Sequence, residues 1–498
     1  MGRKLDSVLD LIHDIENNFP LEKLVYMNVN WWPVFRSEIG VLARNERELV
    51  ALNFSRKSKL YSIFILLIKI PILFKKYLFQ KYSWKDKIKA LDSKPISIVE
   101  PDFITLSSFK HRTDLFENYD YNRYTDPIHF YLKPLKGFNI EIINEALKVQ
   151  KYPYLTYFFH TSLAKHKLKF SCFELRKLLS LRKSFTIGDS FIDLCVFVND
   201  KLDSKLIDFV SVQSKIWTIV NYYFFFSDLF SKCKPKIVFL SSYYSEYFFG
   251  AIWAAKEFGI EIYDYQHGIQ GDYHFAYSKW LNMPVNGYTF LPNFLVYSSL
   301  DKISLDASFT NEKHPKSFVV GNLWNKFWLE NCTKDSNLEK TKNYTKYILY
   351  TLSPIKPYFP KFLLEFMQKS NNTFWWIRVH PRYKFQQNEV ELVLKMFSIK
   401  NYEIELSTNL PIQEVLINSD IHITQYSSTS LDALDFGIKT ILVDKQGKLL
   451  YKNLIDSGDL FFCDNENDLA SLVEADIFTS EIKSNDFVGL KSLFCLTA

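Results

Sequence analysis

The sequence predicts an α/β protein in which two Rossmann-like domains face a cleft, with a helical extension at the N-terminus. Two stretches carry this prediction. Residues 234–270 read as a strand, a helix and a second strand that leads into a Gln-His-Gly loop. Residues 419–444 repeat the order of strand, polar turn, helix and strand. Such βαβ crossovers imply parallel sheets, with ligand-binding groups at the carboxyl ends of the strands.

Length and composition fit two or three folded domains. The chain has 498 residues, and its hydrophobic content of 47% excludes general disorder. We expect an N-terminal helical and basic extension at 1–94, a first Rossmann-like domain at 95–287 and a second at 288–498. Alternation of strands and helices begins near residue 95, and the segment 282–292 contains the Pro and Gly residues typical of a domain boundary.

Residues 56–89 of the extension combine an apolar run with basic flanks. The run over 60–74 is interrupted by Lys69 and Pro71 and is shorter than the ~20 residues that span a membrane. Residues 51–94 hold eleven Lys and Arg against two Asp, a net +9, so the rest of the chain carries −3 of the total +6. This local basicity disfavours a general nucleic-acid binder. It fits a helix on an anionic membrane surface or a buried helix with solvated basic ends, and both remain open.

Several classes of site are disfavoured by the motifs that the sequence lacks. The six cysteines are scattered without a CxxC pair, which indicates a reducing compartment and neither a disulfide framework nor a zinc site. The N-terminal segment is not of signal-peptide type, so we expect a cytoplasmic protein, free or peripheral on the inner face of the membrane. No Walker loop, GxGxxG, HExxH or GxSxG motif occurs, and no DxD pair ends a strand. We therefore expect no cofactor and no metal.

Two polar turns in the second domain have the residue types that bind phosphate. The segment 419–444 places hydroxyl side chains where a helix begins, and the free backbone N–H groups there attract anions. The segment 375–384 ends an apolar strand with an arginine and a histidine. The residues that we expect to bind the phosphate of a donor are Arg378, His380, Tyr426, Ser427, Ser428 and Thr429.

The first domain supplies the candidates for a general base. His267 is the first candidate, because an imidazole can accept a proton near neutral pH, and its alternative role is a structural hydrogen bond to the sheet. Asp272 and His274 follow in the same loop, and Glu246 begins the preceding helix, where it would orient the acceptor or the base. The residues that we expect to support this loop are Gln266, Gly268 and Asn322.

Two further regions have weaker patterns. Residues 109–128 are crowded with charged and polar side chains and are expected to form a substrate-facing lip; the residues concerned are His111, Arg112, Asp114, Asn122 and Asp126. Residues 140–230 are expected to be mostly helical and, in their aromatic-rich parts, buried.

The segments YDYQHGIQGDYHFAY, IRVHP and SDIHITQYSSTSLDALDFG together resemble GT-B glycosyltransferases of bacterial capsule and O-antigen assembly. The resemblance is greatest to the capsular polysaccharide and sialyltransferase-like group, which uses CMP-activated acidic sugars, and more distant to CDP-glycerol glycerophosphotransferases. It covers roughly residues 95–445 and implies that His380, Ser427 and Ser428 bind the donor's phosphate. The chain lacks the acidic Asp/Glu-Asp/Glu-Gly base motif of the sialyltransferases, so the base and the sugar remain open.

The resemblance implies a metal-independent glycosyltransferase with the GT-B fold. It would move a sugar from a nucleotide donor on the second domain to a lipid-linked acceptor on the first, in capsule, O-antigen or lipopolysaccharide biosynthesis. The alternatives are a CDP-polyol phosphotransferase and a non-catalytic assembly component of the same pathway. The expected partners are therefore a nucleotide-sugar donor, a lipid-linked glycan and, through residues 56–89, the inner-membrane surface, but no nucleic acid.

Overall fold

The structure, a computed structural model, describes most of the chain. The described residues are 8–51, 100–143, 151–160, 187–202, 206–271, 274–309, 314–331, 344–353, 356–475 and 490. The basic segment 56–89 and the candidate base Asp272 lie outside them. Within the described ranges, no helix has the length and apolar character that crossing a membrane requires.

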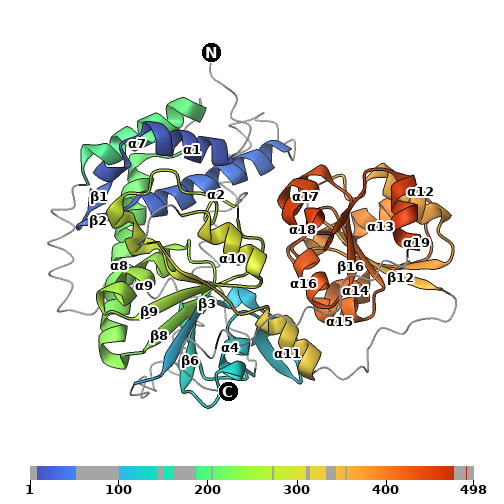
Figure 1. The fold of residues 1–498 in the computed structure, drawn as a ribbon, viewed down its shortest axis with the longest axis horizontal. Helices are drawn as coiled ribbons and strands as arrows, with labels where there is room; N and C mark the ends of the chain where they lie inside the picture. Colours follow the sequence, from blue (N-terminus) through green and yellow to red (C-terminus); the bar gives the residue numbers. More distant parts are fainter. Residues whose placement is uncertain are drawn as a thin grey trace, which may run out of the picture.

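The first unit is built on a seven-stranded sheet in the order β11-β10-β9-β8-β3-β6-β7, with every neighbouring pair parallel. Figure 1 shows it beside the second unit, which has orange and red colours. Its strands are β3 (Phe103–Ser108), β6 (Gly137–Ile143), β7 (Thr156–His160), β8 (Ile237–Leu240), β9 (Glu261–Tyr265), β10 (Asn293–Val296) and β11 (Ser317–Val319).

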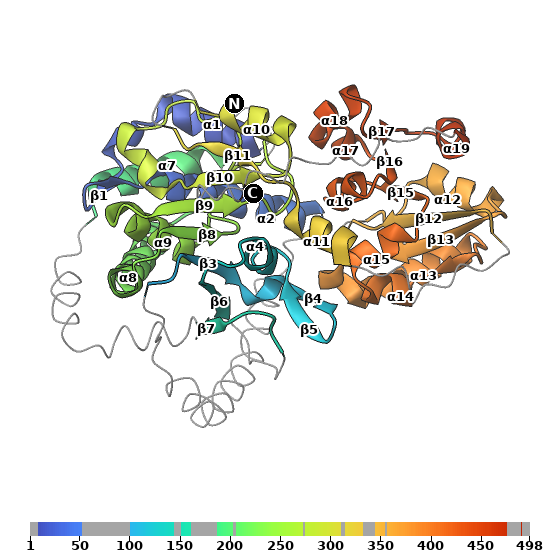
Figure 2. The same ribbon diagram turned by 60° about the horizontal axis from the view of Figure 1, so that its bottom comes forward.

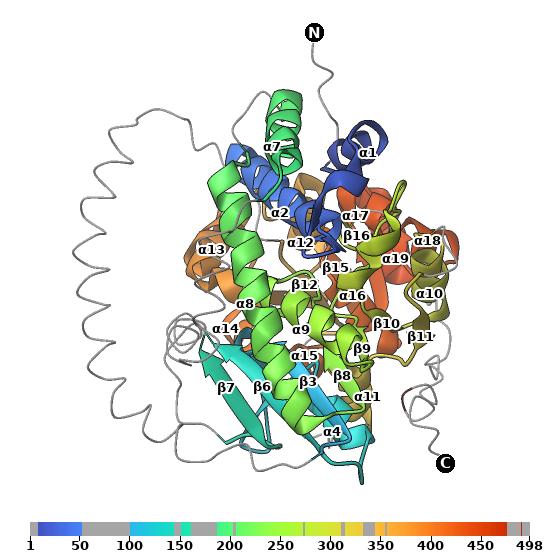
Figure 3. The same cartoon turned by 90° about the vertical axis from the view of Figure 1, so that its left-hand side faces the viewer.

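Helices cover both faces of this sheet, and apolar side chains fill the space on each side. One face is covered by α1 (Val8–Asn18), α2 (Trp32–Ala51), α7 (Asp189–Leu202), α8 (Phe209–Cys233) and α9 (Glu246–Glu257). Figure 3 shows the long α8 running across this face. The other face is covered by α4 (Asp126–Tyr131) and α11 (Leu323–Asn331), and α10 (Ser299–Asp306) follows β10. The N-terminal helices therefore share the core of the first unit.

The second unit has a six-stranded sheet in the order β14-β13-β12-β15-β16-β17, again with parallel neighbours throughout. Its strands are β12 (Lys346–Thr351), β13 (Thr373–Arg378), β14 (Tyr402–Glu403), β15 (Ile421–Thr424), β16 (Lys439–Leu442) and β17 (Phe461–Phe462). Its helices are α12 (Lys361–Lys369), α13 (Gln387–Met396), α14 (Glu405–Asn409), α15 (Ile412–Ile417), α16 (Thr429–Asp435), α17 (Lys445–Leu450), α18 (Lys452–Asp456) and α19 (Glu466–Glu474).

Short elements complete the described fold. Two antiparallel hairpins are formed by β1 (Val25–Tyr26) with β2 (Val29–Asn30), and by β4 (Arg112–Phe116) with β5 (Tyr119–Asn122). Single 3₁₀ turns are η1 (Leu21–Lys23), η2 (Phe109–His111), η3 (Val285–Phe290) and η4 (Pro381–Gln386). The expected α/β class with two Rossmann-like units is thus confirmed, and this is the GT-B architecture that the sequence predicts.

Two expectations from the sequence are corrected by the sheet order. The predicted boundary at 287/288 precedes β10 and β11, yet both strands extend the first sheet beside β9. The chain passes to the second sheet only after β11, through α11, so segment 282–292 is a connection within the first unit. The described part of residues 140–230 is mostly helical, as expected, over α7 and α8, whose apolar faces are buried. Its start differs, because β6 ends and the half-buried strand β7 lies there. Periodicity alone does not separate short apolar strands from buried helices.

The two units are joined by an aromatic contact centred on α11. The ring of Phe116, from the β4–β5 hairpin, lies 5.1 Å from that of Phe327 on α11. Trp324 and Trp328 of the same helix share an apolar cluster with Trp376 of β13. Figure 2 shows α11 and the hairpin between the two sheets. This contact fixes how the carboxyl ends of the strands in one unit face those in the other.

Candidate functional site

A cavity of about 40 Å³ lies between the two units, at the ends of β9 and β15. Its volume corresponds to roughly three water-sized groups, so it matches a phosphate and not a whole nucleotide. The lining residues of the first unit and of the link into α11 are Arg123, Tyr124, His267, Gly268, Tyr297, Asn322 and Trp324. Those of the second unit are Ser428, Leu431 and Asp432. Four residues singled out in the sequence, His267, Gly268, Asn322 and Ser428, therefore surround one cavity.

The loop that carries His267 is held by the side chain of Gln266. The Gln266 Oε1 accepts a hydrogen bond from the backbone N–H of Tyr297 at 2.7 Å, and its Nε2 donates to the carbonyl of Gly268 at 3.0 Å. Tyr297 also donates its hydroxyl to the Gln266 carbonyl at 2.7 Å. This amide is buried and satisfied on both sides, so its contacts fit the support role expected from the sequence.

The imidazole of His267 has one nitrogen engaged and one unused. Its Nε2 lies 3.1 Å from the hydroxyl of Tyr244, while its buried Nδ1 has no hydrogen-bond partner among the described residues. Tyr124 donates its hydroxyl to the His267 carbonyl at 3.1 Å. Burial lowers the pKa of His267 to about 4, so the ring is neutral at pH 7. In the tautomer that donates from Nε2 to Tyr244, Nδ1 is the proton-accepting atom.

Of the other candidate bases, His274 and Glu246 are described, and neither lines this cavity. His274 packs its ring 5.4 Å from that of Tyr244, and its Nδ1 accepts from the backbone N–H of Ala276 at 3.2 Å. Glu246, in the first turn of α9, pairs with Lys215 at 3.0 Å. These contacts tie the two side chains to their own surroundings in the first unit, away from the second.

In the second unit, the hydroxyl groups of the turn before α16 have two roles: some stabilise the turn, and one faces the cavity. Ser427 Oγ accepts from the backbone N–H of Thr429 at 3.2 Å and donates to Thr429 Oγ1 at 3.0 Å, so these two residues stabilise the turn itself. Tyr451 anchors it by donating its hydroxyl to the Ser427 carbonyl at 2.7 Å. Ser428 begins the helix, is exposed and makes no capping bond through its side chain. It is the hydroxyl of this turn that lines the cavity.

Arg378, His380 and Tyr426 do not line the cavity. Arg378 ends β13, and its Nη1 donates to the carbonyls of Ser407 and, at 2.7 Å, Leu410. His380 is half-buried with its ring 5.5 Å from that of Tyr383, and Tyr426 is half-buried in the turn. Of the predicted donor-binding residues, only Ser428 lines the cavity.

Arg123 is a cavity residue that sequence reasoning missed. It follows β5, and its Nε and Nη2 each bind a carboxylate oxygen of Asp114 at 3.0 Å. Burial, and then the positive charge of Arg123, lower the pKa of Arg378 to about 10. The two guanidinium groups, one from each unit, are therefore electrostatic neighbours at the cleft. No sequence signal marks Arg123, because its position depends on the folded β4–β5 hairpin.

The expected polar lip over 109–128 is corrected in part. Arg112 is fully buried, with Nη2 2.6 Å from Glu141 and Nη1 2.8 Å from Asp126. Asn122 donates to the same Glu141 carboxylate at 2.9 Å. These side chains form a closed network that fixes the hairpin beside β6, as buried charges require partners. These side chains hold the hairpin that precedes Arg123, and they do not line the cavity.

A second polar contact crosses between the units at the start of α11. Asn325 Nδ2 donates to Asp432 at 2.9 Å and to Asp435 at 2.8 Å, both on α16. Asn322 Nδ2 donates to Asp432 at 3.2 Å. Burial raises the pKa of Asp432 and Asp435, the latter to about 7. Asn322 and Asp432 therefore form a polar floor of the cavity. Across the described ranges, no group of three or more metal-binding side chains is assembled.

No protein-family model and no curated protein sequence matches this chain. Among solved structures, UDP-GlcNAc 2-epimerase from Neisseria meningitidis, bound to UDP-GlcNAc, is similar at 12% identity; the match covers 79% of this chain and 98% of that one, with a TM-score of 0.47. The epimerase from Methanocaldococcus jannaschii is similar at 14% identity, with the same coverage and a TM-score of 0.46. Spinosyn rhamnosyltransferase SpnG is similar at 10%, covering 79% and 98%, with a TM-score of 0.40. The fold assignment rests on the two parallel sheets and not on these likenesses.

Proposed function

We propose that this chain is a metal-independent glycosyltransferase of the GT-B type that transfers a sugar from a nucleotide donor to a lipid-linked acceptor of surface-polysaccharide assembly. A cytidine-linked acidic sugar is the first candidate donor. The observation that carries the proposal is the cavity where the His267 loop of one unit meets Ser428 and Asp432 of the other, beside Arg123. In this proposal the acceptor approaches from the membrane's inner face.

The charge around the cleft supports an anionic ligand. A nucleotide-sugar donor leaves as a phosphate, so its site must stabilise negative charge that develops on a phosphoryl oxygen. Burial, and then the positive charge of Arg123, lower the pKa of Arg378, whereas the carboxylate of Asp114 outweighs burial and raises the pKa of Arg123. A phosphate between the units would favour the charged form of Arg378. In this proposal the Ser428 hydroxyl, which makes no capping bond, donates a hydrogen bond to one of the phosphate oxygens.

His267 is proposed as the base that takes the proton of the acceptor hydroxyl. Its unused Nδ1 belongs to a neutral ring, which is the protonation state that a base requires. The pKa of about 4 makes the free imidazole a weak base. A bound phosphate near the ring would favour its protonated form and raise this pKa, so donor binding would activate the base. The Tyr244 contact at 3.1 Å would fix the tautomer throughout.

The proposal is tested by thermal unfolding with CMP, CDP, UDP and GDP in turn. A ligand at 100 times its Kd stabilises by about 2.7 kcal/mol. For a chain of 498 residues this corresponds to a Tm increase of about 2–3 °C. We expect one nucleotide to give this increase, with a smaller increase for Ser428→Ala. Transfer is then measured with the matching nucleotide sugars. The proposal fails if no nucleotide raises the Tm and no sugar is transferred or hydrolysed.

A further inference from the structure

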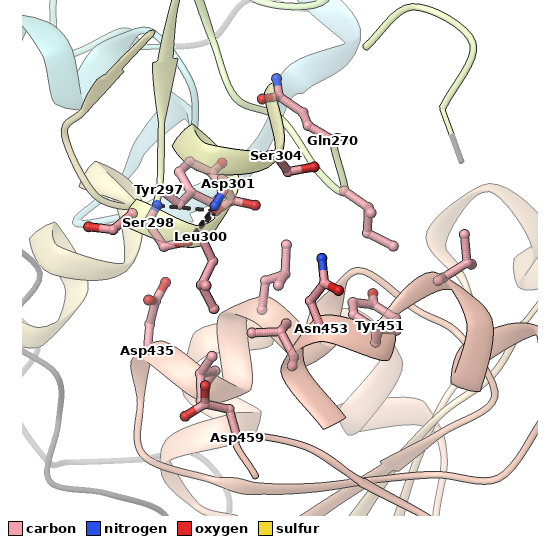
Figure 4. A pocket seen from close by; sticks show the side chains of 16 residues that line it. Gln270, Tyr297, Ser298, Leu300, Asp301, Ser304, Asp435, Tyr451, Asn453 and Asp459 are labelled. Atoms are coloured by element: carbon pink, nitrogen blue, oxygen red, sulfur yellow. Dashed lines mark hydrogen bonds between the residues drawn. The ribbon is translucent and has the colours of Figure 1, made fainter. Parts of the chain in front are cut away.

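A second cavity, of about 250 Å³, lies beside the phosphate-sized one and has no role in the proposed donor site. Figure 4 shows that its walls come from both units, with α10 on one side and the α16–α18 region on the other. The first unit contributes Ile269, Gln270, Tyr297, Ser298, Ser299, Leu300, Asp301 and Ser304. The second contributes Leu431, Leu434, Asp435, Leu450, Tyr451, Asn453, Leu454 and Asp459.

The two walls differ in chemistry. The second unit presents leucines, and Ile269 from the first unit packs into the same apolar cluster as Leu431, Leu450 and Leu454. The first unit presents the hydroxyls that surround Asp301 at the start of α10. None of the lining residues is Lys, Arg or His, whereas three are aspartates. A phosphate or carboxylate ligand is therefore disfavoured here, in contrast to the neighbouring cavity with Arg123.

The polar groups of this cavity are hydroxyl, amide and carboxyl groups, most of which can both donate and accept hydrogen bonds. Burial raises the pKa of Asp301, and burial raises that of Asp435 to about 7, so burial favours the neutral form of both carboxyl groups. Gln270 is only 9% exposed, and neither its Oε1 nor its Nε2 has a partner among the described residues. An unsatisfied buried amide of this kind is destabilising unless a ligand or water meets it. The wall beside Ser304 therefore has hydrogen-bonding capacity that the protein itself does not use.

One loop connects the two cavities. Gly268 and His267 line the smaller one, and the next two residues, Ile269 and Gln270, line the larger. Tyr297 lines both. Leu431 of the second unit lines both as well, so the two cavities share wall residues from each unit.

We propose that the larger cavity binds one uncharged sugar ring of the acceptor glycan. A pyranose ring presents C–H faces that suit the leucines and hydroxyls that suit the carboxyl and amide groups, which occur on both walls. The volume of about 250 Å³ is just below the 300–1,000 Å³ typical of small-molecule sites, which limits the occupant to about one ring. This inference rests on the proposed function, because it assigns the cavity to the acceptor of that transfer. The inference also specifies that the acceptor ring in this cavity carries no carboxylate group.

The test is saturation-transfer NMR on the full chain with methyl glycosides of neutral hexoses and N-acetylhexosamines, and with methyl glucuronide as the anionic probe. Leu450→Trp fills the cavity, and Leu449→Trp places the same ring on the exposed neighbouring position, outside it. We expect a signal from at least one neutral glycoside with the unaltered chain and with Leu449→Trp, and at least a fivefold smaller one with Leu450→Trp. The glucuronide should give none.

The inference is overturned if both tryptophan variants give equal signals, if no neutral glycoside binds, or if the glucuronide binds better. Asn453→Trp, at an exposed cavity position, repeats the test should Leu450→Trp unfold, with Lys452→Trp as its neighbouring control. The nucleotide Tm panel is run on the same samples. If a cavity-filling variant keeps the nucleotide-induced Tm increase but loses the sugar signal, the inference is supported. An absent nucleotide response in the unaltered chain counts against the proposed function alone.

Discussion

Asp264 is a buried acid directly beneath the His267 loop, and its removal should change how stability depends on pH. It lies on β9, fully buried, where its Oδ2 accepts the hydroxyl of Tyr277 at 2.7 Å. The ring of Tyr277 is 6.2 Å from that of His267. Burial raises the pKa of Asp264 to about 8, so the carboxyl is mostly protonated at neutral pH.

The sign and size of the effect follow from this shift. Because the pKa is higher in the folded state than the value of about 3.9 in the unfolded chain, the contribution of Asp264 to stability is complete below pH 4 and is lost as pH rises towards 8. A shift of roughly four units corresponds to about 5 kcal/mol over this window. Asp264→Asn stays neutral throughout and keeps an oxygen for Tyr277. The unfolding free energy of Asp264→Asn should therefore lack the loss that Asp264 causes as pH rises from 4 to 8.

The assay is urea unfolding of the unaltered chain and Asp264→Asn at intervals from pH 4.5 to 8.5. The difference in unfolding free energy between the two should change by up to ~1.4 kcal/mol per pH unit, in favour of the variant at high pH. Tyr277→Phe removes the hydrogen bond that favours the ionised carboxylate, so its loss of stability should continue above pH 8. Curves for the unaltered chain and Asp264→Asn that stay parallel across the whole range would refute the reasoning.

Three further changes test the walls of the cleft. Ser428→Ala should leave the Tm unchanged, since the hydroxyl makes no capping bond, but should reduce the nucleotide-induced Tm increase; equal increases would exclude a ligand contact. Gly447→Ala should lower the unfolding free energy by ~1–3 kcal/mol in urea titrations, because a Cβ there would lie 2.1 Å from the carbonyl oxygen of Gln425. Asn325→Leu removes one buried hydrogen-bond donor from each of two carboxyl groups of α16 and should cost ~2–4 kcal/mol, whereas Asn331→Leu, on the exposed end of the same helix, should cost under ~1 kcal/mol.

The two βαβ stretches could be predicted because each combines a short apolar strand with an amphipathic or buried helix and a turn. The strand predicted from Ile421 is β15, the helix after the serine turn is α16, and the strand near Thr440 is β16. The crossover over 234–270 is β8-α9-β9 with parallel pairing. Local pattern and turn chemistry sufficed in both cases, since strand and helix are separated by polar residues at the sheet edge.

The parts of the candidate site that could not be predicted depend on contacts between segments that are distant in the sequence. Arg123 reaches the cleft only because Arg112, Glu141 and Asp126 hold the β4–β5 hairpin against the first sheet. The sequence singled out Arg112 and Asp126 as candidate substrate contacts, but in the structure both side chains are paired within this buried network. The larger cavity could not be predicted either, because its leucine wall and its hydroxyl wall belong to different units and are brought together by α11.

The central claim, that one phosphate is bound by both units, is tested most directly by a double-mutant cycle on nucleotide affinity. Arg123→Lys and Ser428→Ala change one side chain on each side of the cavity, and their single and combined effects on the Kd of the nucleotide that raises the Tm are measured by calorimetry. We expect a coupling energy of at least ~0.5 kcal/mol. The pair Arg123→Lys with Ser471→Ala on α19 should show none. Effects that add within ~0.3 kcal/mol for the first pair, or a Kd that Arg123→Lys leaves unchanged, would contradict a phosphate shared between the two units.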